Sequence, residues 1–219
     1  MAKKNQQPEI EKEVIKHIAV AGNIGSGKTT LTDLLAKHYN WEARFEDVES
    51  NPYLNDFYAD MPRWSFNLQI YFLNSRLQQL VEIQQGKKTV VQDRTIYEDA
   101  HIFAPNLHEM GLMSTRDFEN YISLFKTINK QITPPNLLIY LKASLGTLVS
   151  QIEKRGRAYE DNIRLDYLKQ LNQYYDNWIE NYKEGPLLVI SVDNLNFADK
   201  PEDFGKVVDK INAELFGLF

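Results

Sequence analysis

One stretch of eight residues limits the possible fold more than any other part of the sequence. It has the pattern G-x-x-x-x-G-K-T and lies between the apolar run 18–21 and an amphipathic segment that begins at Lys28. Glycines at this spacing let the backbone curl, so that successive N–H groups and a helix N-terminus face a polyphosphate. The residues predicted to bind the triphosphate are Gly22, Asn23, Ile24, Gly25, Ser26, Gly27, Lys28, Thr29 and Thr30.

Two side chains of this phosphate loop have separate chemical tasks. Lys28 supplies a mobile positive charge to the β and γ phosphates, and the Thr29 hydroxyl is placed to meet Mg²⁺. The alternative is a glycine-rich turn that only resembles a phosphate loop, and the strand and helix patterns on its two sides disfavour it. The sequence therefore predicts a site for a nucleoside triphosphate.

Composition excludes several other classes of protein. The 219 residues include 43% hydrophobic and 25% charged residues, which is typical of one globular domain, and there is no cysteine for a disulfide or a thiolate metal site. The net charge of −5 and the pI near 5.5 argue against nucleic-acid and membrane-surface partners. Because no apolar run approaches membrane-spanning length and no signal-peptide core is seen, we expect a cytoplasmic protein.

The hydrophobic pattern predicts five short strands that alternate with helices. We expect residues 1–14 to form a flexible extension and residues 15–219 a single domain. Strands are expected at 16–21, 42–46, 88–92, 136–141 and 187–192, and helices at 28–39, 64–85, from 98, and at 115–130, 144–153, 163–182 and 201–215. This order predicts an α/β fold with a five-stranded parallel sheet flanked by helices and with ligands at the carboxyl ends of the strands.

Charged residues at two predicted strand ends are candidates for the reaction. Glu46 follows the second strand, where a carboxylate beside a triphosphate could accept a proton or meet a cation. Asp93 and Arg94 follow the third strand, where the carboxylate could hold the water shell of Mg²⁺ and the arginine could stabilise charge on a reacting oxygen. The alternatives are a solvated charge at Glu46 and a surface ion pair at the other two residues.

Two further groups could complete a binding site. Gln69 and Arg76 are seven residues apart, so they share one face of the long helix, and an amide beside a guanidinium can read the edge of a nucleobase. Arg155 and Arg157 belong to an arginine-rich segment at about 151–162, which could close over a phosphoryl group as a lid. A solvated helix edge and a basic helix end remain the alternatives.

Five motifs in this order resemble the deoxynucleoside kinase family, in particular its bacterial deoxyadenosine/deoxyguanosine kinase branch. The motifs are the phosphate loop at 22–29, FEDV at 45–48, WSFNLQ at 64–69 with Arg76, DRTIYED at 93–99 and RGRAYE at 155–160. The resemblance covers residues 17–215. It implies a P-loop kinase-like fold with an arginine-rich lid, and transfer of the γ-phosphoryl group of ATP to the 5′-hydroxyl of a deoxynucleoside.

The resemblance also implies a role for each matching residue. It makes Glu46 the general base, with Arg94 and Lys28 as the other catalytic residues, and it places Thr29 and Asp93 at Mg²⁺. Arg155 and Arg157 match lid arginines that clamp the donor phosphates. The residues matched to deoxynucleoside binding are Tyr58 and Glu160 at the sugar 3′-hydroxyl, Gln69, Arg76, Asp99 and Phe103 at the base, and Glu46 and Arg94 at the 5′-hydroxyl.

Family members are typically dimers, and some are inhibited by the end-product deoxynucleoside triphosphate, so we expect a homodimer and feedback inhibition. An amide edge suits adenine and cytosine, and Arg76 with Asp99 fills the space that a thymine methyl would need. We therefore rank deoxyadenosine first as the substrate, then deoxyguanosine and deoxycytidine. A nucleoside monophosphate kinase and a P-loop NTPase switch remain the alternatives. Glu46 disfavours the monophosphate kinase, because a carboxylate would repel an anionic acceptor.

Three positions depart from the family pattern. Asp47 stands where the family often has proline, and this extra carboxylate could raise the pKa of Glu46 if the two lie close together. Gln151 replaces a third lid arginine, which leaves two arginines to compensate the transferring group. Thr95 stands where serine is usual and preserves the hydroxyl.

Overall fold

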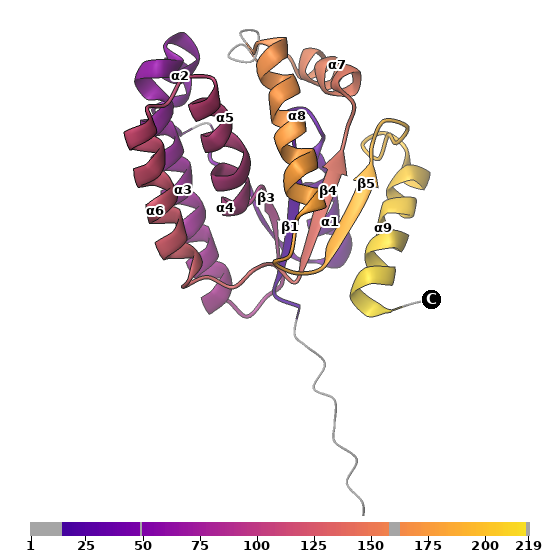
Figure 1. Ribbon diagram of the computed structural model, residues 1–219. Coiled ribbons are helices and arrows are strands. Elements are labelled where there is room, and N and C mark those ends of the chain that lie inside the picture. Colours follow the sequence, from indigo (N-terminus) through magenta and orange to yellow (C-terminus); the bar gives the residue numbers. More distant parts are fainter. Residues whose placement is uncertain (1–14, 49, 158–162, 218–219) are drawn as a thin grey trace, which may run out of the picture.

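A five-stranded parallel sheet forms the centre of the protein, whose computed structural model describes residues 15–48, 50–157 and 163–217 (Figure 1). The strands are β1 (His17–Gly22), β2 (Glu42–Arg44), β3 (Val90–Asp93), β4 (Leu137–Lys142) and β5 (Leu187–Ser191). Their order across the sheet is β2-β3-β1-β4-β5, and all neighbouring strands are parallel. The predicted sheet is confirmed, and β1 delivers the phosphate loop to the middle of its carboxyl edge.

Helices cover both faces of this sheet (Figure 1). One layer contains α3 (Met61–Gln85), α4 (Ile96–Glu98), the π-helical segment η1 (Asp99–Phe103), α5 (Ala104–Glu109), α6 (Thr115–Asn129) and α8 (Leu165–Glu180). The other layer contains α1 (Lys28–Tyr39) and α9 (Pro201–Phe216). Two shorter helices, α2 (Leu54–Ala59) and α7 (Leu145–Arg155), lie beyond the carboxyl ends of the strands.

The two helical layers enclose two hydrophobic cores, one on each face of the sheet. In β1, Ala19 and Ala21 join the core under α3 and α8, while Ile18 and Val20 join the core under α1 and α9. Every residue of β1 is buried. A strand covered on both faces needs a continuous apolar run, which is the pattern that the sequence shows.

Capping residues mark helix boundaries at three places. Asn40 adopts a left-handed conformation (φ 55°) after α1, and the hydroxyls of Ser114 and Ser144 accept hydrogen bonds from the first turns of α6 and α7. No helix within the described part of the chain is long and apolar enough to cross a membrane.

Several predicted boundaries were wrong. β2 ends at Arg44, so Glu46 lies in the following loop, and α3 begins at Met61 with Asp60 as its N-cap rather than at Trp64. The helix α2 lies between β2 and α3, where no helix was predicted. The helix expected from Glu98 begins at Ile96 and contains the π-helical segment. The predicted extension at 1–14 lies outside the described residues.

Candidate active site

A cleft of about 390 Å³ opens at the carboxyl edge of the sheet, beside the phosphate loop. The residues that line it come from the loops after β1, β2 and β3, from the end of β3, from the start of α1, from α2, α3, η1 and α8, and from the end of α7 and the segment after it. Thirteen of them were predicted as site residues: Ile24, Gly25, Lys28, Thr29, Glu46, Tyr58, Gln69, Asp93, Arg94, Asp99, Phe103, Arg155 and Arg157.

The phosphate loop is held in its curled form by its glycines and by α8. Gly25 has φ +86°, and a Cβ atom there would lie 2.8 Å from the carbonyl oxygen of Leu148, so a side chain does not fit. The Asn23 side chain donates to the carbonyl oxygen of Leu168 (3.1 Å) and to Oδ1 of Asn172 (2.7 Å). The loop is therefore anchored to the helix that packs beside it.

Lys28 lies buried at the floor of the cleft. Its ammonium group donates to the carbonyl oxygen of Asn23 (3.0 Å). Burial, with the nearby charge of Arg94, lowers the pKa of Lys28 from 10.5 to about 8. A bound polyphosphate would supply the negative charge that favours the protonated lysine.

Thr29 and Asp93 meet at the edge of the phosphate loop. The Thr29 hydroxyl donates to Oδ2 of Asp93 (2.5 Å), while Oδ1 of Asp93 is buried and has no hydrogen-bond partner within the described part of the protein. Burial raises the pKa of Asp93. A hydroxyl beside an unpartnered buried carboxylate oxygen is an oxygen donor set that suits Mg²⁺, and a cation would offset the cost of burying the charge.

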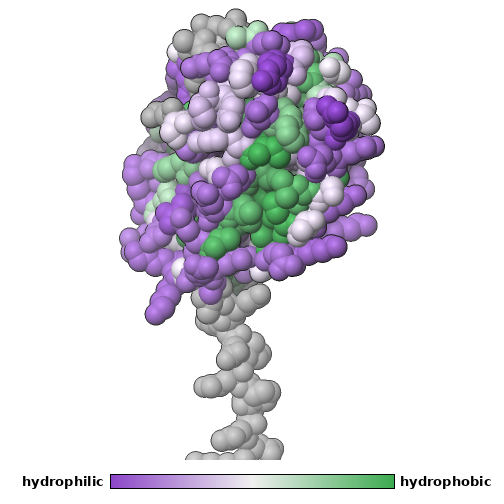
Figure 2. Space-filling model, turned by 90° about the vertical axis from the view of Figure 1, so that its left-hand side faces the viewer, coloured by the Kyte–Doolittle hydropathy of each residue, from purple (hydrophilic) through white to green (hydrophobic). Residues whose placement is uncertain are grey.

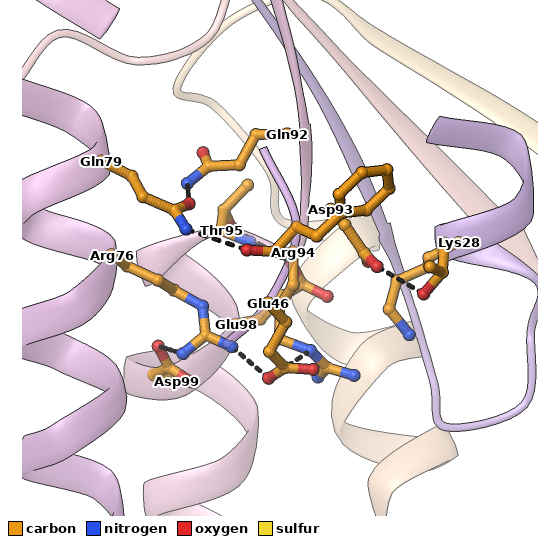
Figure 3. A network of polar contacts seen from close by, with 12 residues as sticks. Lys28, Glu46, Arg76, Gln79, Gln92, Asp93, Arg94, Thr95, Glu98 and Asp99 are labelled. Carbon is orange, nitrogen blue, oxygen red and sulfur yellow. Dashed lines mark hydrogen bonds and ion pairs between the residues drawn. The ribbon is translucent and has the colours of Figure 1, made fainter. Parts of the chain in front are cut away.

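A network of charged groups lies across the cleft from Lys28 (Figure 3). Arg76 donates from Nη2 to Oε1 of Glu46 (2.5 Å) and from Nη1 to Oδ2 of Asp99 (2.7 Å). The Nε atom of Arg94 lies 3.5 Å from the same oxygen of Glu46. Glu46 is thus paired with two arginines, and the solvated charge considered from the sequence is wrong.

These arginines determine the charge state of Glu46. Burial acts to raise its pKa, but the charges of Arg94, Arg76 and Lys28 outweigh burial and hold the pKa below its usual value. The rise that Asp47 could cause is not found, because the net shift at Glu46 is downward. Asp47 instead accepts hydrogen bonds from the hydroxyls of Ser50 and Tyr71, and it does not contribute to the shift at Glu46.

The base-reading pair predicted on α3 is buried. Gln69 and Arg76 are each 3% exposed, so the alternative of a solvated helix edge is wrong. Oε1 of Gln69 is buried without a hydrogen-bond partner among the described residues, and Gln69 lines the cleft. An unpartnered amide oxygen facing a cleft is available to a ligand.

The π-helical segment places two more predicted residues at this end of the cleft. Asp99 and Phe103 are its first and last residues, and the wider turn of a π-helix brings residues four apart close to one line. Asp99 pairs with Arg76, and the guanidinium of Arg94 lies 4.5 Å from the centre of the Phe103 ring. Burial raises the pKa of Asp99 to about 7, against the charges of the two arginines.

Of the four residues predicted to form the lid and to bind the sugar, three lie in the described part of the chain. Tyr58 lies on α2 and Arg155 ends α7; both line the cleft, as does Arg157. Glu160, predicted to hold the sugar 3′-hydroxyl, lies outside the described residues. Gln151 lies on the exposed side of α7.

Sequence analysis assigned no role to two residues that support the site, Glu98 and Tyr175. Glu98 completes a capping box with Thr95, whose signal, T-x-x-E, is visible in the sequence. Tyr175 lies on α8 with its hydroxyl 3.2 Å from Nη1 of Arg94. Its aromatic-rich helix gave no indication of which ring would face the site.

A parallel sheet with a phosphate loop, together with buried arginines and carboxylates at the strand ends, defines a P-loop protein of the class that binds nucleoside triphosphates. Residues 18–216 match the family described as deoxynucleoside kinase. The chain belongs to the deoxynucleoside kinase family and is a phosphotransferase that uses a nucleoside triphosphate donor. This membership sets aside the monophosphate kinase and NTPase switch alternatives.

Curated relatives and solved structures agree with this membership. The deoxyadenosine/deoxycytidine kinase of Bacillus subtilis is 39% identical over 198 residues, covering 89% of this chain and 90% of the relative. The deoxyadenosine kinase of Lactobacillus acidophilus is 38% identical, covering 92% and 97%. The structure of deoxyadenosine kinase from M. mycoides with dCMP and dCDP bound has a TM-score of 0.81 at 30% identity, covering 90% of this chain and 99% of that one.

Proposed function

We propose that this kinase transfers the γ-phosphoryl group of ATP to the 5′-hydroxyl of deoxyadenosine, and less readily to deoxyguanosine and deoxycytidine. The observation that carries the proposal is Glu46, a carboxylate at the cleft held by Arg76 and Arg94. An ionised carboxylate can accept a proton from a neutral hydroxyl, whereas it would repel a phosphorylated acceptor.

The proposed chemistry is in-line transfer assisted by positioning and charge. Glu46 accepts the proton of the 5′-hydroxyl as that oxygen attacks phosphorus, and Arg94 orients the carboxylate and the hydroxyl. Lys28 stabilises charge on the β and γ phosphates, and Arg155 and Arg157 clamp the donor from the lid. Tyr58 and Glu160 hold the sugar 3′-hydroxyl.

Thr29 and Asp93 would hold Mg²⁺. The unpartnered Oδ1 of Asp93 supports this assignment. When bound, the ion would neutralise charge on the donor phosphates.

The base preference follows from the buried end of the cleft. Gln69 can donate and accept at once, which suits adenine and cytosine, and Phe103 offers a ring against which the base can pack. Arg76 and Asp99, paired at 2.7 Å, occupy the space that a thymine methyl would need. Relatives described as deoxyadenosine kinases support ranking deoxyadenosine first.

We further propose a homodimer and feedback inhibition by a deoxynucleoside triphosphate. Figure 2 shows an apolar area on the side formed by α3 and α6, where Val81 and Leu124 are 41% and 42% exposed. A second copy could cover this face. Light scattering should give the mass of a dimer, and Val81→Glu with Leu124→Glu should give a monomer.

Binding of dATP by the M. mycoides enzyme supports the proposed feedback inhibition. Titration of the kinase activity with dATP tests this proposal.

Release of ADP from Mg-ATP tests the proposed acceptor. The assay compares no acceptor, each of the four deoxynucleosides, and their monophosphates. We expect the highest kcat/KM with deoxyadenosine, lower values with deoxyguanosine and deoxycytidine, and no release with thymidine or a monophosphate. Release with thymidine would refute the role of Arg76 and Asp99, and release with a monophosphate would refute that of Glu46.

A further inference from the structure

Two buried side chains, Glu98 and Tyr175, hold the first residue of the phosphate loop. Neither has exposed surface. Oε1 of Glu98 accepts a hydrogen bond from the Gly22 N–H (3.2 Å), and the Tyr175 hydroxyl lies 2.7 Å from the Gly22 carbonyl oxygen and 2.8 Å from Oε1 of Glu98. Both the N–H and the carbonyl oxygen of Gly22 therefore contact this pair. Glu98 lies on α4 and Tyr175 on α8, so two separate helices hold the start of the phosphate loop.

The same pair holds the turn that follows β3. Oε2 of Glu98 accepts from the Thr95 N–H (2.7 Å), and Nη1 of Arg94 donates to the Tyr175 hydroxyl (3.2 Å). Arg94 has φ +69°, which is costly for a residue with a side chain and persists only where neighbouring contacts fix it. Glu98 provides one such contact at the next residue.

The chemistry of the two groups is complementary. Within the described part of the chain, Glu98 is the acceptor in every hydrogen bond that it makes, which suits a carboxylate. The Tyr175 hydroxyl accepts from Arg94 and has one proton to give, to Gly22 or to Glu98. Burial raises the pKa of Tyr175 well above its usual value, so the proton stays on the hydroxyl.

We propose that Glu98 and Tyr175 are positioning residues that fix the separation between the phosphate loop, which holds the donor, and Arg94, which serves the acceptor. Neither is among the described residues that line the cleft, so both act through Gly22 and Arg94. Displacing reacting groups by about 1 Å can cost about a hundredfold in rate. The assignment depends on the role proposed above for Arg94.

A single-turnover experiment tests the proposal with the full chain in excess over Mg-ATP and the deoxynucleoside that it phosphorylates fastest. Tyr175→Phe removes one oxygen and keeps the ring that stacks on Tyr140, whose centre is 5.7 Å away. We expect the rate constant of transfer to fall at least about tenfold with full amplitude, while both KM values, taken from steady-state ADP release, stay within about twofold of the original.

Tyr140→Phe is the matched control. It removes a hydroxyl from the adjacent ring, and that hydroxyl has no hydrogen-bond partner among the described residues. Its rate constant should be unchanged. Glu98→Gln should reproduce the loss seen in Tyr175→Phe, and the double variant should lose little more than the worse single variant, because the two residues act as a unit.

Several results would overturn the proposal. The first is an unchanged rate constant in Tyr175→Phe. The second is a loss of amplitude without a change of rate constant, which indicates only a smaller folded fraction. The third is a fall of the rate constant in Tyr140→Phe as large as that in Tyr175→Phe. Arg94→Lys distinguishes a failure of the proposed role of Arg94 from a failure of the positioning role of Glu98 and Tyr175. A slow Arg94→Lys with a fast Tyr175→Phe refutes the positioning unit only, whereas a fast Arg94→Lys refutes the proposed role of Arg94 and the positioning unit with it.

Discussion

Replacing Lys28 with methionine should make the ligand-free protein more stable while abolishing binding of the triphosphate. Lys28 is 7% exposed, and burial with the charge of Arg94 lowers its pKa from 10.5 to about 8. A shift of this size corresponds to about 3 kcal/mol, because each pKa unit is worth about 1.4 kcal/mol. Methionine keeps a similar shape without the charge. The carbonyl oxygen of Asn23 keeps the hydrogen bond from the Ser26 N–H (3.1 Å).

The sign of the pH dependence follows from the lowered pKa. Below about pH 8 Lys28 is protonated in both the folded and the unfolded chain, so the folded state carries the full cost of burying the charge. Between about pH 8 and 10.5 the unfolded chain binds more protons, and the free energy of unfolding of the wild type therefore rises with pH. The advantage of Lys28→Met should be largest below about pH 8 and should disappear near pH 10.5.

Urea unfolding of the ligand-free proteins at pH 7 and pH 10 measures this difference. At pH 7 we expect Lys28→Met to gain about 1–3 kcal/mol, or up to about 6–12 °C in Tm for a chain of this size. Mg-ATP at a hundred times its Kd should stabilise the wild type by about 2.7 kcal/mol and leave the variant unchanged. This would be a case in which a binding residue reduces stability.

Lys37→Met is the matched control on the same helix. Lys37 is exposed and pairs with Asp33 on the surface, so its replacement should change stability by less than about 0.5 kcal/mol at either pH. A Lys28→Met protein that is less stable than the wild type at pH 7 would refute the reasoning. A gain of the same size at both pH values would refute the assignment of that gain to the charge.

Three further changes test other parts of the site. Glu46→Gln should lower kcat by about 10²–10⁴ while leaving the Kd for the deoxynucleoside nearly unchanged, as measured by ADP release and calorimetry, and retained turnover would remove Glu46 from the mechanism. Gln69→Ala should raise the KM for deoxyadenosine about 10- to 100-fold, and an unaltered preference among nucleosides would contradict base reading. Gly25→Ala should cost about 2–4 kcal/mol in urea unfolding, since the new Cβ would lie 2.8 Å from the Leu148 carbonyl oxygen, whereas Gly205→Ala, with open space around it, should not destabilise the protein.

The parts of the fold that were predicted correctly depend on local signals. The phosphate loop is a contiguous motif whose glycines are required by the backbone, and β1 and β4 are continuous apolar runs because both faces are covered. The starts of α6 and α7 follow Ser114 and Ser144, whose hydroxyls act within one turn of their own helices. Such features are visible to anyone who reads the sequence alone.

The errors lie where tertiary contacts decide the structure. α2 has six residues, too few for a clear helical period, and Leu54 and Phe57 are stabilised there by packing against α3. β2 is a three-residue edge strand, so no apolar pattern marks its end at Arg44. The π-helical turn at Asp99–Phe103 has no sequence period that separates it from an α-helix.

In the candidate site, too, local spacing could be predicted from the sequence, whereas contacts between distant residues could not. Spacing placed Gln69 and Arg76 on one helix face, but only the fold decides that this face is buried. The pKa of Glu46 could not be predicted from its neighbour Asp47, because the deciding charges come from Arg76 on α3 and Arg94 after β3. Glu98 and Tyr175 are 77 residues apart in the chain, so their contact has no local signal.

The balance of charge around the cleft explains why the donor needs more than the phosphate loop. Within the described part of the chain, the buried cations Lys28, Arg76 and Arg94 face the carboxylates of Glu46, Asp93, Glu98 and Asp99. These groups largely neutralise one another before any ligand binds, so they offer little net attraction for a triphosphate. We assign the additional positive charge to Mg²⁺, which would bind with the donor, and to Arg155 and Arg157, which line the cleft.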